Sequence, residues 1–413
     1  MNIFILVWSY LKARPLNTAI NIILLALGIA VITILLLFKN QLDQKITENS
    51  RGIDLVIGAK GSPLQLILCN IFHIDFPTGN IKLQEADKIS KSRLIKTAIP
   101  LALGDSYNSY RIIGTNMRYA ELYQAQLAQG AWWRDDLEVT IGANVATLGK
   151  LKLDDEFTSA HGLTQQGHAH NEHKYVVKSI MQKTNTVLDN LILTNIESIW
   201  AMHETGDEVH PHEIDTSKVS SSLVPSVASD DSLKEITSVL VKYRSPMAAI
   251  QLPRAVNSQS SLQAASPAFE TARLFSILGV GVDVMLAFAY VLILISALSI
   301  FIALYNSLKE RRYDMAVMRS MGASRSKLLV SILTEGGLLT LFGCVIGLLL
   351  GHGVLIILST MVEQTQKAGI TGIIFYTEEW IILGGSLLLG LLCALIPAVQ
   401  AYRTDISSVL ARN

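Results

Sequence analysis

Charged residues are scarce in this sequence. Asp, Glu, Lys and Arg make up 16% of the 413 residues, against about 25% in soluble domains, and 50% are hydrophobic. So few charges do not cover the water-facing surface of a chain this long, which argues against a wholly soluble protein. Lys plus Arg and Asp plus Glu number 34 each, so the net positive charge that nucleic-acid binding requires is also missing, and we expect no nucleic-acid partner.

Motifs for disulfides, structural zinc and enzymes are missing too. Cys69, Cys344 and Cys393 are too few for a disulfide framework and show no metal-binding spacing. The sequence has no phosphate-binding G-x-x-x-x-G-K-[ST] loop, and the glycine-rich stretch 58–62 has the wrong spacing. No G-x-S-x-G or H-E-x-x-H motif occurs either. The sequence therefore indicates neither an enzyme nor a nucleotide-binding chain.

Four long apolar stretches are present instead, at 16–38, 273–306, 328–362 and 380–402. A helix needs about 20 residues to cross the hydrocarbon of a bilayer, and each stretch is long enough. The first stretch is too long for a secretory signal, and no cleavage site follows it. We predict four transmembrane helices.

Lysine and arginine predict the orientation of these spans, because short cytoplasmic loops carry an excess of both. The loop at 307–327 contains six basic residues, whereas the loop at 363–379 has one lysine and three glutamates. Basic residues also precede the first span and follow the last. Both termini (1–15 and 403–413) are thus predicted to be cytoplasmic, and residues 39–272 extracytoplasmic.

The predicted fold is an integral membrane protein with four transmembrane α-helices and a large α+β extracytoplasmic domain between the first and second. In that domain, alternating apolar residues predict strands at 111–114, 138–142 and 174–180. Helices are expected at 84–92 and 195–204, and an exposed loop at 213–232. Apolar positions continue at helical spacing beyond residue 38 and before residue 273, so the flanking helices are expected to extend outward as a stalk.

For several residues within or next to the spans, the sequence suggests one or two roles. Residues 1–15 form either an amphipathic helix in the cytoplasmic interface or the start of the first span. Asp283 and Glu335, the acids within the spans, lie near span ends, where they are either hydrated or functional. The lone histidines His73 and His352 are interpreted as packing or hydrogen-bonding residues.

Three glycines predict where helices meet. Gly343, Gly347 and Gly351 recur every four residues and therefore lie on one face of the third span. Small residues allow helix backbones to approach closely in lipid. We expect this face to contact another helix.

Residues 309–324 (KERRYDMAVMRSMGAS) resemble the coupling helix of the FtsX/MacB/LolC-E-like ABC transporter permease family. Glu335 with the three glycines, and the run 395–398 followed by Arg403 and Leu410, are similar to later motifs of that family. The stretches 130–133 and 139–142 resemble its periplasmic core domain more loosely. The resemblance covers most of the chain.

This resemblance implies a permease-only subunit of the bacterial inner membrane that works by mechanotransmission. A separate cytoplasmic ABC ATPase would bind ATP and Mg²⁺, the chain itself would bind no cofactor, and a second permease copy or a homologous permease would complete the complex. Export or extraction of a periplasmic or membrane client would follow, with a possible periplasmic or outer-membrane partner. The alternative is a non-transporting, FtsX-like signalling subunit. The residues implied in ATPase coupling are Glu310, Arg311, Arg312, Met315, Ala316, Met318, Arg319, Gly322 and Ala323.

The composition of the coupling segment supports that role on physical grounds. Methionines at 315, 318 and 321, interleaved with arginines, would give an adaptable apolar surface rimmed with charge, which fits a groove on another protein. The alternative is a basic anchor that only fixes the topology.

Histidines cluster in the extracytoplasmic domain, where seven of the nine lie between residues 161 and 212. Neutral imidazole is a common metal ligand, so a zinc site is a hypothesis here, linked to zinc transport or sensing. Its alternatives are a polar hairpin or a pH-responsive surface. The candidate ligands are His168, His170, His173, His203, His210 and His212.

Zinc titration of the full-length chain tests this hypothesis. Wild-type protein is expected to bind Zn(II) at least roughly tenfold more tightly than a variant with all six candidate histidines replaced by alanine, because those imidazoles supply the ligands. Isothermal titration calorimetry measures both affinities. Equal affinity for the two proteins would refute the site.

Overall fold

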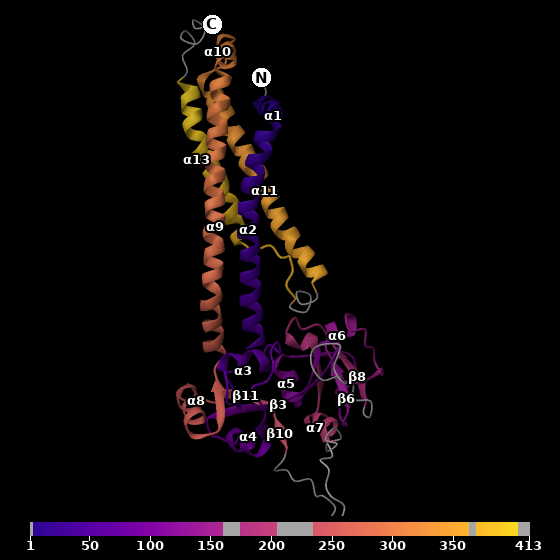
Figure 1. Ribbon diagram of the computed structural model, residues 1–413. Helices are drawn as coiled ribbons and strands as arrows, with labels where there is room; N and C mark the ends of the chain where they lie inside the picture. The colour runs from indigo at the N-terminus through magenta and orange to yellow at the C-terminus, as the bar shows by residue number, and fades with distance from the viewer. Residues whose placement is uncertain (1–2, 160–173, 205–233, 363–368, 404–413) are drawn as a thin grey trace, which may run out of the picture. The chain divides into compact units, whose positions relative to one another are not determined.

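The structure is a computed structural model that describes residues 3–159, 174–204, 234–362 and 369–403. It consists of two compact units: a helical unit (residues 1–43 and 277–413) and an α/β unit (residues 44–276). The long helices α2 and α9 contribute residues to both (Figure 1). The helices of the helical unit are α1 (Ile3–Ala13), α2 (Pro15–Asn49), α9 (Pro267–Glu310), α10 (Arg312–Ser320), α11 (Arg325–Met361) and α13 (Glu378–Tyr402).

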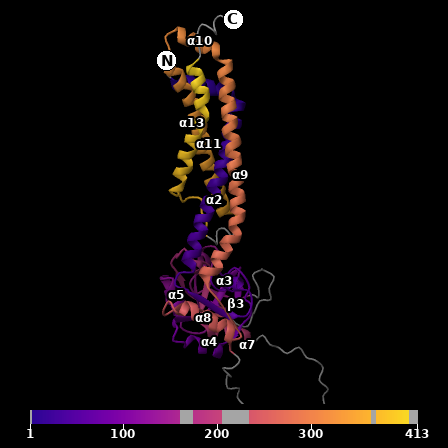
Figure 2. The same cartoon turned by 90° about the vertical axis from the view of Figure 1, so that its left-hand side faces the viewer.

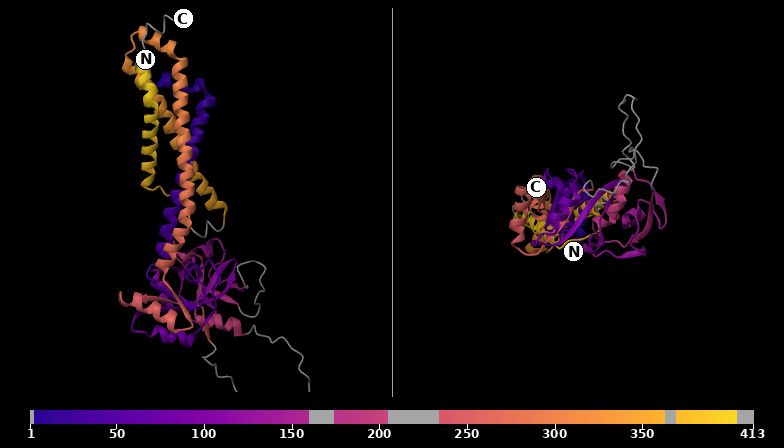
Figure 3. Two further views of the ribbon diagram at one scale, coloured as in Figure 1. Left: turned by 60° about the vertical axis from the view of Figure 1, so that its left-hand side comes forward. Right: turned by 90° about the horizontal axis from the view of Figure 1, so that it is seen from below.

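Helices α2, α9, α11 and α13 are each long and apolar enough to cross a membrane, with mean hydropathies of 2.4 to 2.9. This agrees with the four predicted spans and fits a multi-pass membrane protein. Within the helical unit these helices run side by side (Figures 2 and 3). Helix α2 continues to Asn49 and α9 begins at Pro267, so the expected helical continuation of both spans is confirmed.

Residues 3–13 form a helix of their own. Pro15 begins α2, where its fixed φ and missing N–H suit the first helical turn. The hydroxyl of Thr18 donates to the carbonyl oxygen of Leu11 (3.0 Å) across the break. Val7 and Leu11 are buried, whereas Phe4, Ile5 and Trp8 are exposed, so α1 carries apolar side chains on its exposed as well as its buried face.

The three glycines of α11 lie against α2. A Cβ added at Gly343 would meet the side chain of Leu25, and one at Gly351 would meet Thr33. A Cβ added at Gly347 would lie 2.7 Å from the carbonyl oxygen of Ala26 and 2.8 Å from the Cβ of Ile29. The two backbones therefore approach closely because these positions carry no side chain.

The α/β unit is built on one mixed sheet. Among the described residues, ten strands belong to it, in the order β12-β1-β11-β3-β4-β9-β6-β8-β5, with β7 beside β8. The pairs β4–β9 and β6–β8 are parallel and the others antiparallel. The strands of the unit are β1 (Leu55–Ala59), β2 (Ile81–Lys82), β3 (Ile95–Tyr107), β4 (Tyr110–Gly114), β5 (Leu127–Gly130), β6 (Glu138–Ile141), β7 (Glu156–Phe157), β8 (Tyr175–Met181), β9 (Leu191–Thr194), β10 (Glu235–Ile236), β11 (Ser238–Tyr243) and β12 (Leu262–Ala265).

Short helices cover this sheet. They are α3 (Pro63–Asn70), α4 (Leu83–Ser90), α5 (Met117–Leu122), α6 (Ala143–Thr147), the 3₁₀ helix η1 (Val187–Asn190), α7 (Ile196–Glu204) and α8 (Ala248–Gln259). Strands β4, β6 and β8 and helices α4 and α7 confirm the elements predicted from the sequence in this unit. The predicted loop at 213–232 lies outside the described residues.

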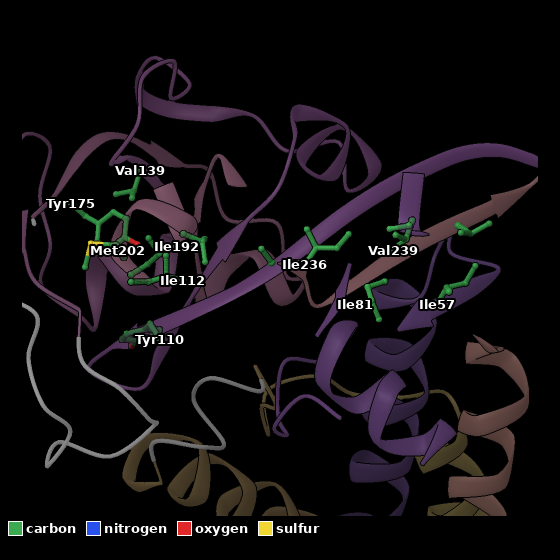
Figure 4. Close-up of a cluster of buried hydrophobic side chains, with 14 of the residues drawn as sticks. Ile57, Ile81, Tyr110, Ile112, Val139, Tyr175, Ile192, Met202, Ile236 and Val239 are labelled. Atoms are coloured by element: carbon green, nitrogen blue, oxygen red, sulfur yellow. The ribbon is translucent and has the colours of Figure 1, made fainter. Parts of the chain in front are cut away.

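Both faces of the sheet are buried. Val239 and Val241 of β11 pack into one cluster of apolar side chains, and Leu240 between them packs into a second cluster. Successive side chains of a strand point to opposite faces, so the two clusters lie on the two sides of the sheet. Figure 4 shows the first cluster, with Ile112 and Ile192 from neighbouring strands close together.

His73 is a buried hydrogen-bonding residue of this unit, as predicted. Its Nε2 lies 2.9 Å from the hydroxyl oxygen of Tyr119. Burial, together with the nearby charge of Arg111, lowers the pKa of His73 to about 3. The imidazole is therefore neutral at physiological pH.

Substituting Gly347 tests the packing of α11 on α2. Gly347→Ala is expected to lower the free energy of unfolding by about 1–3 kcal/mol, because the new Cβ overpacks against Ala26 and Ile29. Gly353→Ala on the same helix is the matched control, since its Cβ would have no neighbour within 4 Å. Reversible unfolding in mixed micelles measures both, and equal stability of the two variants would contradict the close approach.

Candidate functional site

Helix α10 is a short helix between two long ones. Arg311 separates it from the end of α9, and Gly322 follows it with a φ of +96°, a conformation that side chains rarely adopt. Ser324 then caps α11, its hydroxyl oxygen accepting from the Lys327 amide at 3.4 Å. Local sequence thus accounts for the end of α10, at Gly322, and for the start of α11, at Ser324.

One face of α10 is buried within the chain. Met315 and Ala316 are 6% and 1% exposed. Met315 packs in an apolar cluster with residues of α9, α11 and α13, namely Leu308, Leu328, Ile332, Ala398 and Ala401. The prediction that Met315, Met318 and Met321 form an exposed apolar surface is therefore wrong in part. Met315 packs α10 onto the helical unit, and Met318 is only partly exposed.

The opposite face of α10 and the turn after it are open. Tyr313 is 49% exposed, Asp314 is exposed, and Met321 is 82% exposed. Among the other residues expected in coupling, Glu310 and Gly322 are exposed, whereas Arg319 and Ala323 are partly buried. Arg312 begins α10, and its side chain lies outside the described part of the structure.

A buried ion pair fixes the start of α10. Nη1 of Arg311 lies 3.4 Å from Oε2 of Glu335 on α11, and Glu335 is only 7% exposed. Of the two interpretations of Glu335, the hydrated position is therefore wrong. Asp283, by contrast, is an exposed residue of α9.

Helix α1 joins this ion pair. The guanidinium carbon of Arg311 lies 3.6 Å from the ring centroid of Tyr10, a cation–π contact. Burial raises the pKa of Tyr10, and the positive charge of Arg311 acts in the opposite direction. Arg14, just after α1, forms an ion pair with Glu310 at the end of α9. Arg311 and its neighbours therefore connect α1, α9, α10 and α11.

A second polar cluster lies at the other end of α11. Nε2 of His352 is 2.7 Å from Oε2 of Glu379, and its Nδ1 is 2.6 Å from the carbonyl oxygen of Gly372. The prediction that His352 is a hydrogen-bonding residue is confirmed. Both ring nitrogens face acceptors, which fits an imidazolium paired with a carboxylate. Gln41 of α2 makes two hydrogen bonds of 2.8 Å with the backbone of Thr371.

The sequence pattern does not single out Glu379. The available signal is a pair of glutamates directly before an apolar run, which equally fits a loop outside the membrane. The structure shows Glu379 fully buried in the first turn of α13, where its Oε1 also accepts from the Tyr376 amide at 2.9 Å.

The candidate zinc ligands lie largely outside the described residues. This applies to His168, His170, His173, His210 and His212. His203 belongs to α7, but its side chain is not described. In the ranges that the structure describes, no group of three or more His, Cys, Asp or Glu side chains is arranged to hold a metal ion. The zinc hypothesis therefore stays a prediction.

Residues 286–406 match the family model of the FtsX-like permease C-terminal domain. An uncharacterized ABC transporter permease of Methanocaldococcus jannaschii is 30% identical over 127 residues, which is 30% of this chain and 31% of that protein. The ABC transporter permease YtrF of Bacillus subtilis is 27% identical over 134 residues, 29% of this chain and 30% of YtrF. The alignments thus span about a third of the length of these curated relatives.

Two solved extramembrane domains were also found. The periplasmic region of MacB from Actinobacillus actinomycetemcomitans aligns with 56% of this chain and 98% of that chain, at 14% identity and a TM-score of 0.33. The extracellular domain of the transporter YknZ from Gram-positive bacteria aligns with 52% of this chain and 99% of that chain, at 11% identity and a TM-score of 0.28.

Breaking the pair of Arg311 and Glu335 tests its role. Glu335→Gln and Arg311→Gln are each expected to destabilise the helical unit by about 3 kcal/mol, because each leaves a buried charge without its partner. The double variant should cost less than the sum of the single variants, by about 0.5–3 kcal/mol.

Unfolding in mixed micelles measures this cycle. Asp283→Asn, which removes an exposed acid from α9, is the control and should change stability by less than about 0.5 kcal/mol. Strict additivity of the two single substitutions would show that the pair contributes nothing.

Proposed function

Because residues 286–406 match the family model of the FtsX-like permease C-terminal domain, we propose that this chain is the membrane subunit of an ABC transporter complex. The match to this domain is the observation that carries the proposal. The proposal places the ATPase on a separate chain, and these 413 residues contain no phosphate-binding loop of their own. Both relatives are named ABC transporter permeases, which supports the same assignment.

The proposed contact with the ATPase is the open face of α10. Tyr313 and Asp314 of α10 offer an aromatic ring and a carboxylate, and Met321 in the turn after it offers an adaptable apolar side chain. The buried face, with Met315 and Ala316, fastens that helix to the helical unit. A partner that moves the open face therefore also moves the ends of α9, α11 and α13.

Helix α9 is the proposed lever. It is continuous over 44 residues, which corresponds to about 66 Å of α-helix. It ends beside α10 and begins directly after β12, the last strand of the α/β unit. Displacement of α10 during ATP hydrolysis would thus be transmitted along an unbroken helix to the α/β unit. The four long helices are strongly apolar, with mean hydropathies of 2.4 to 2.9, which favours action on a client outside the membrane over passage of a solute between them.

The proposed setting is the bacterial inner membrane. The basic loop that contains α10 supports a cytoplasmic location for α10 and both termini, and an extracytoplasmic location for the α/β unit. We further propose that the chain dimerises with a second permease copy or a homologous permease. The complex would export or extract a periplasmic or membrane client.

Substituting Met321 tests the proposed contact. Met321→Asp is expected to weaken binding of the ABC ATPase isolated with the wild-type chain by roughly tenfold or more, because it places a charge in an apolar contact. The thermal midpoint of the chain alone should not change, since Met321 is 82% exposed. Co-purification and ATPase activity of the complex measure the effect.

Met361→Asp is the matched control. Met361 is 80% exposed at the opposite end of α11, so its substitution should leave ATPase binding unchanged. If Met321→Asp binds the ATPase as wild type does, α10 is not the contact; if no ABC-type ATPase binds the wild-type chain at all, the proposed function is wrong.

A further inference from the structure

One stretch of β3 has an open edge. Strand β4 pairs with β3 only from Ala102 to Tyr107, whereas β11 pairs with β3 from Ile95 to Leu101. After Gly114 the chain leaves the sheet toward α5. The first half of β3 is therefore paired on one side only, within the residues that the structure describes.

Hydrogen bonds show which backbone groups face this edge. The carbonyl oxygen of Val241 on β11 accepts from the Asp54 amide (2.9 Å), so Val241 points toward β1 and away from its β3 partner, Ala98. The N–H and C=O of Ala98 therefore face the open side of β3. The carbonyl oxygen of Pro100 lies on that side too, where it accepts from the hydroxyl of Thr115 (2.9 Å).

Two clefts flank this edge, with volumes of about 430 and 480 Å³. Ile99 and Leu240 line the first, and Ile95 and Val239 line the second. Ile99 and Leu240 of the first cleft belong to one core cluster, and Ile95 and Val239 of the second cleft belong to the other, so the two clefts lie mainly on opposite faces of the sheet. Val241, which packs with Val239, also lines the first cleft.

Both clefts are rich in positive charge. Lys96 and Arg118 line both of them, Lys242 lines the first, and Lys91 and Arg244 line the second. Each cleft has a single acid among its lining residues, Glu121 and Asp87 respectively. In the described part of the chain, no carboxylate lies within 4 Å of any of these five basic side chains. The clefts thus combine unpaired cations with an unpaired strand edge.

We propose that an acidic segment of a partner protein binds here in extended form, as an additional strand beside Ala98. Strand addition uses the free N–H and C=O of the edge, and it sends alternate side chains of the peptide to the two faces of the sheet. Acidic side chains on both faces would then meet the basic side chains of both clefts. A second copy of this edge is a poor occupant, because Lys96 and Lys242 would face like charges.

This inference goes beyond the proposed function, because it assigns a partner surface to the α/β unit and requires neither nucleotide nor ATPase. The test uses the full-length chain in detergent without nucleotide, with binding of a labelled peptide Glu-Glu-Thr-Glu-Glu-Thr-Glu followed by fluorescence anisotropy. A second peptide carries N-methyl groups on two successive central residues, which removes donors from both of its edges. We expect saturable binding of the first peptide and roughly tenfold weaker binding of the second.

Substitutions in the chain complete the test. Lys96→Glu combined with Arg118→Glu is expected to weaken binding by roughly tenfold or more, and Arg118→Gln alone serves if that variant does not fold. Lys60→Glu is the control, an exposed lysine of the same unit that lines neither cleft, and it should bind as wild type does.

Three results would overturn the proposal. One is the absence of saturable binding, and another is equal binding by the cleft variants and wild type. The third is equal binding of the N-methylated peptide together with displacement by phosphatidylglycerol vesicles, which would assign the clefts to anionic lipid headgroups. None of these outcomes bears on ATPase binding at α10, so the two proposals fail separately.

Discussion

The buried pair of Arg311 and Glu335 is the interaction on which the arrangement around α10 depends. It joins Arg311, the residue just before α10, to Glu335 in the third turn of the apolar helix α11, where an unpaired charge would be very costly. Because the penalty for separating the two charges is large, the pair favours one position of α10 over others. The contact of Arg311 with Tyr10 extends the same constraint to α1. A short helix that would otherwise be free to shift is thereby attached to three longer ones.

Two other kinds of contact hold the rest of the helical unit together, namely close backbone packing and a second polar pair. Between α2 and α11 the contact is made by backbone approach at Gly343, Gly347 and Gly351, where apolar side chains alone would give little net attraction in lipid. At the far end, His352 and Glu379 form a second polar connection between α11 and α13. With polar pairs at both ends and close packing between them, the helices are more suited to moving as a block than to sliding individually.

The sequence predicts structure correctly where one physical requirement dominates. Length and hydropathy are enough to identify four spans, and alternation was enough for β8, whose side chains are buried and half-exposed in turn. It missed β1, β9 and β11, because both faces of these strands are covered and their apolar runs do not alternate. It also misjudged Met315, because the side chains that bury it, such as those of Ala398 and Ala401, come from a distant helix whose position the local pattern does not encode.

The open edge of β3 can accept a strand from a partner protein and is still a poor site for pairing with a second copy of this chain. Pro100 removes one donor from that edge, and the hydroxyl of Thr115 already occupies one acceptor, so few backbone groups remain free there, those of Ala98 among them. So short an edge provides too few hydrogen bonds for strand pairing alone to be stable in water. A partner must therefore gain additional free energy from the clefts on either side, and their basic side chains decide which sequences do so. The backbone geometry of the edge therefore requires an extended ligand, and the charge of the clefts favours an acidic one.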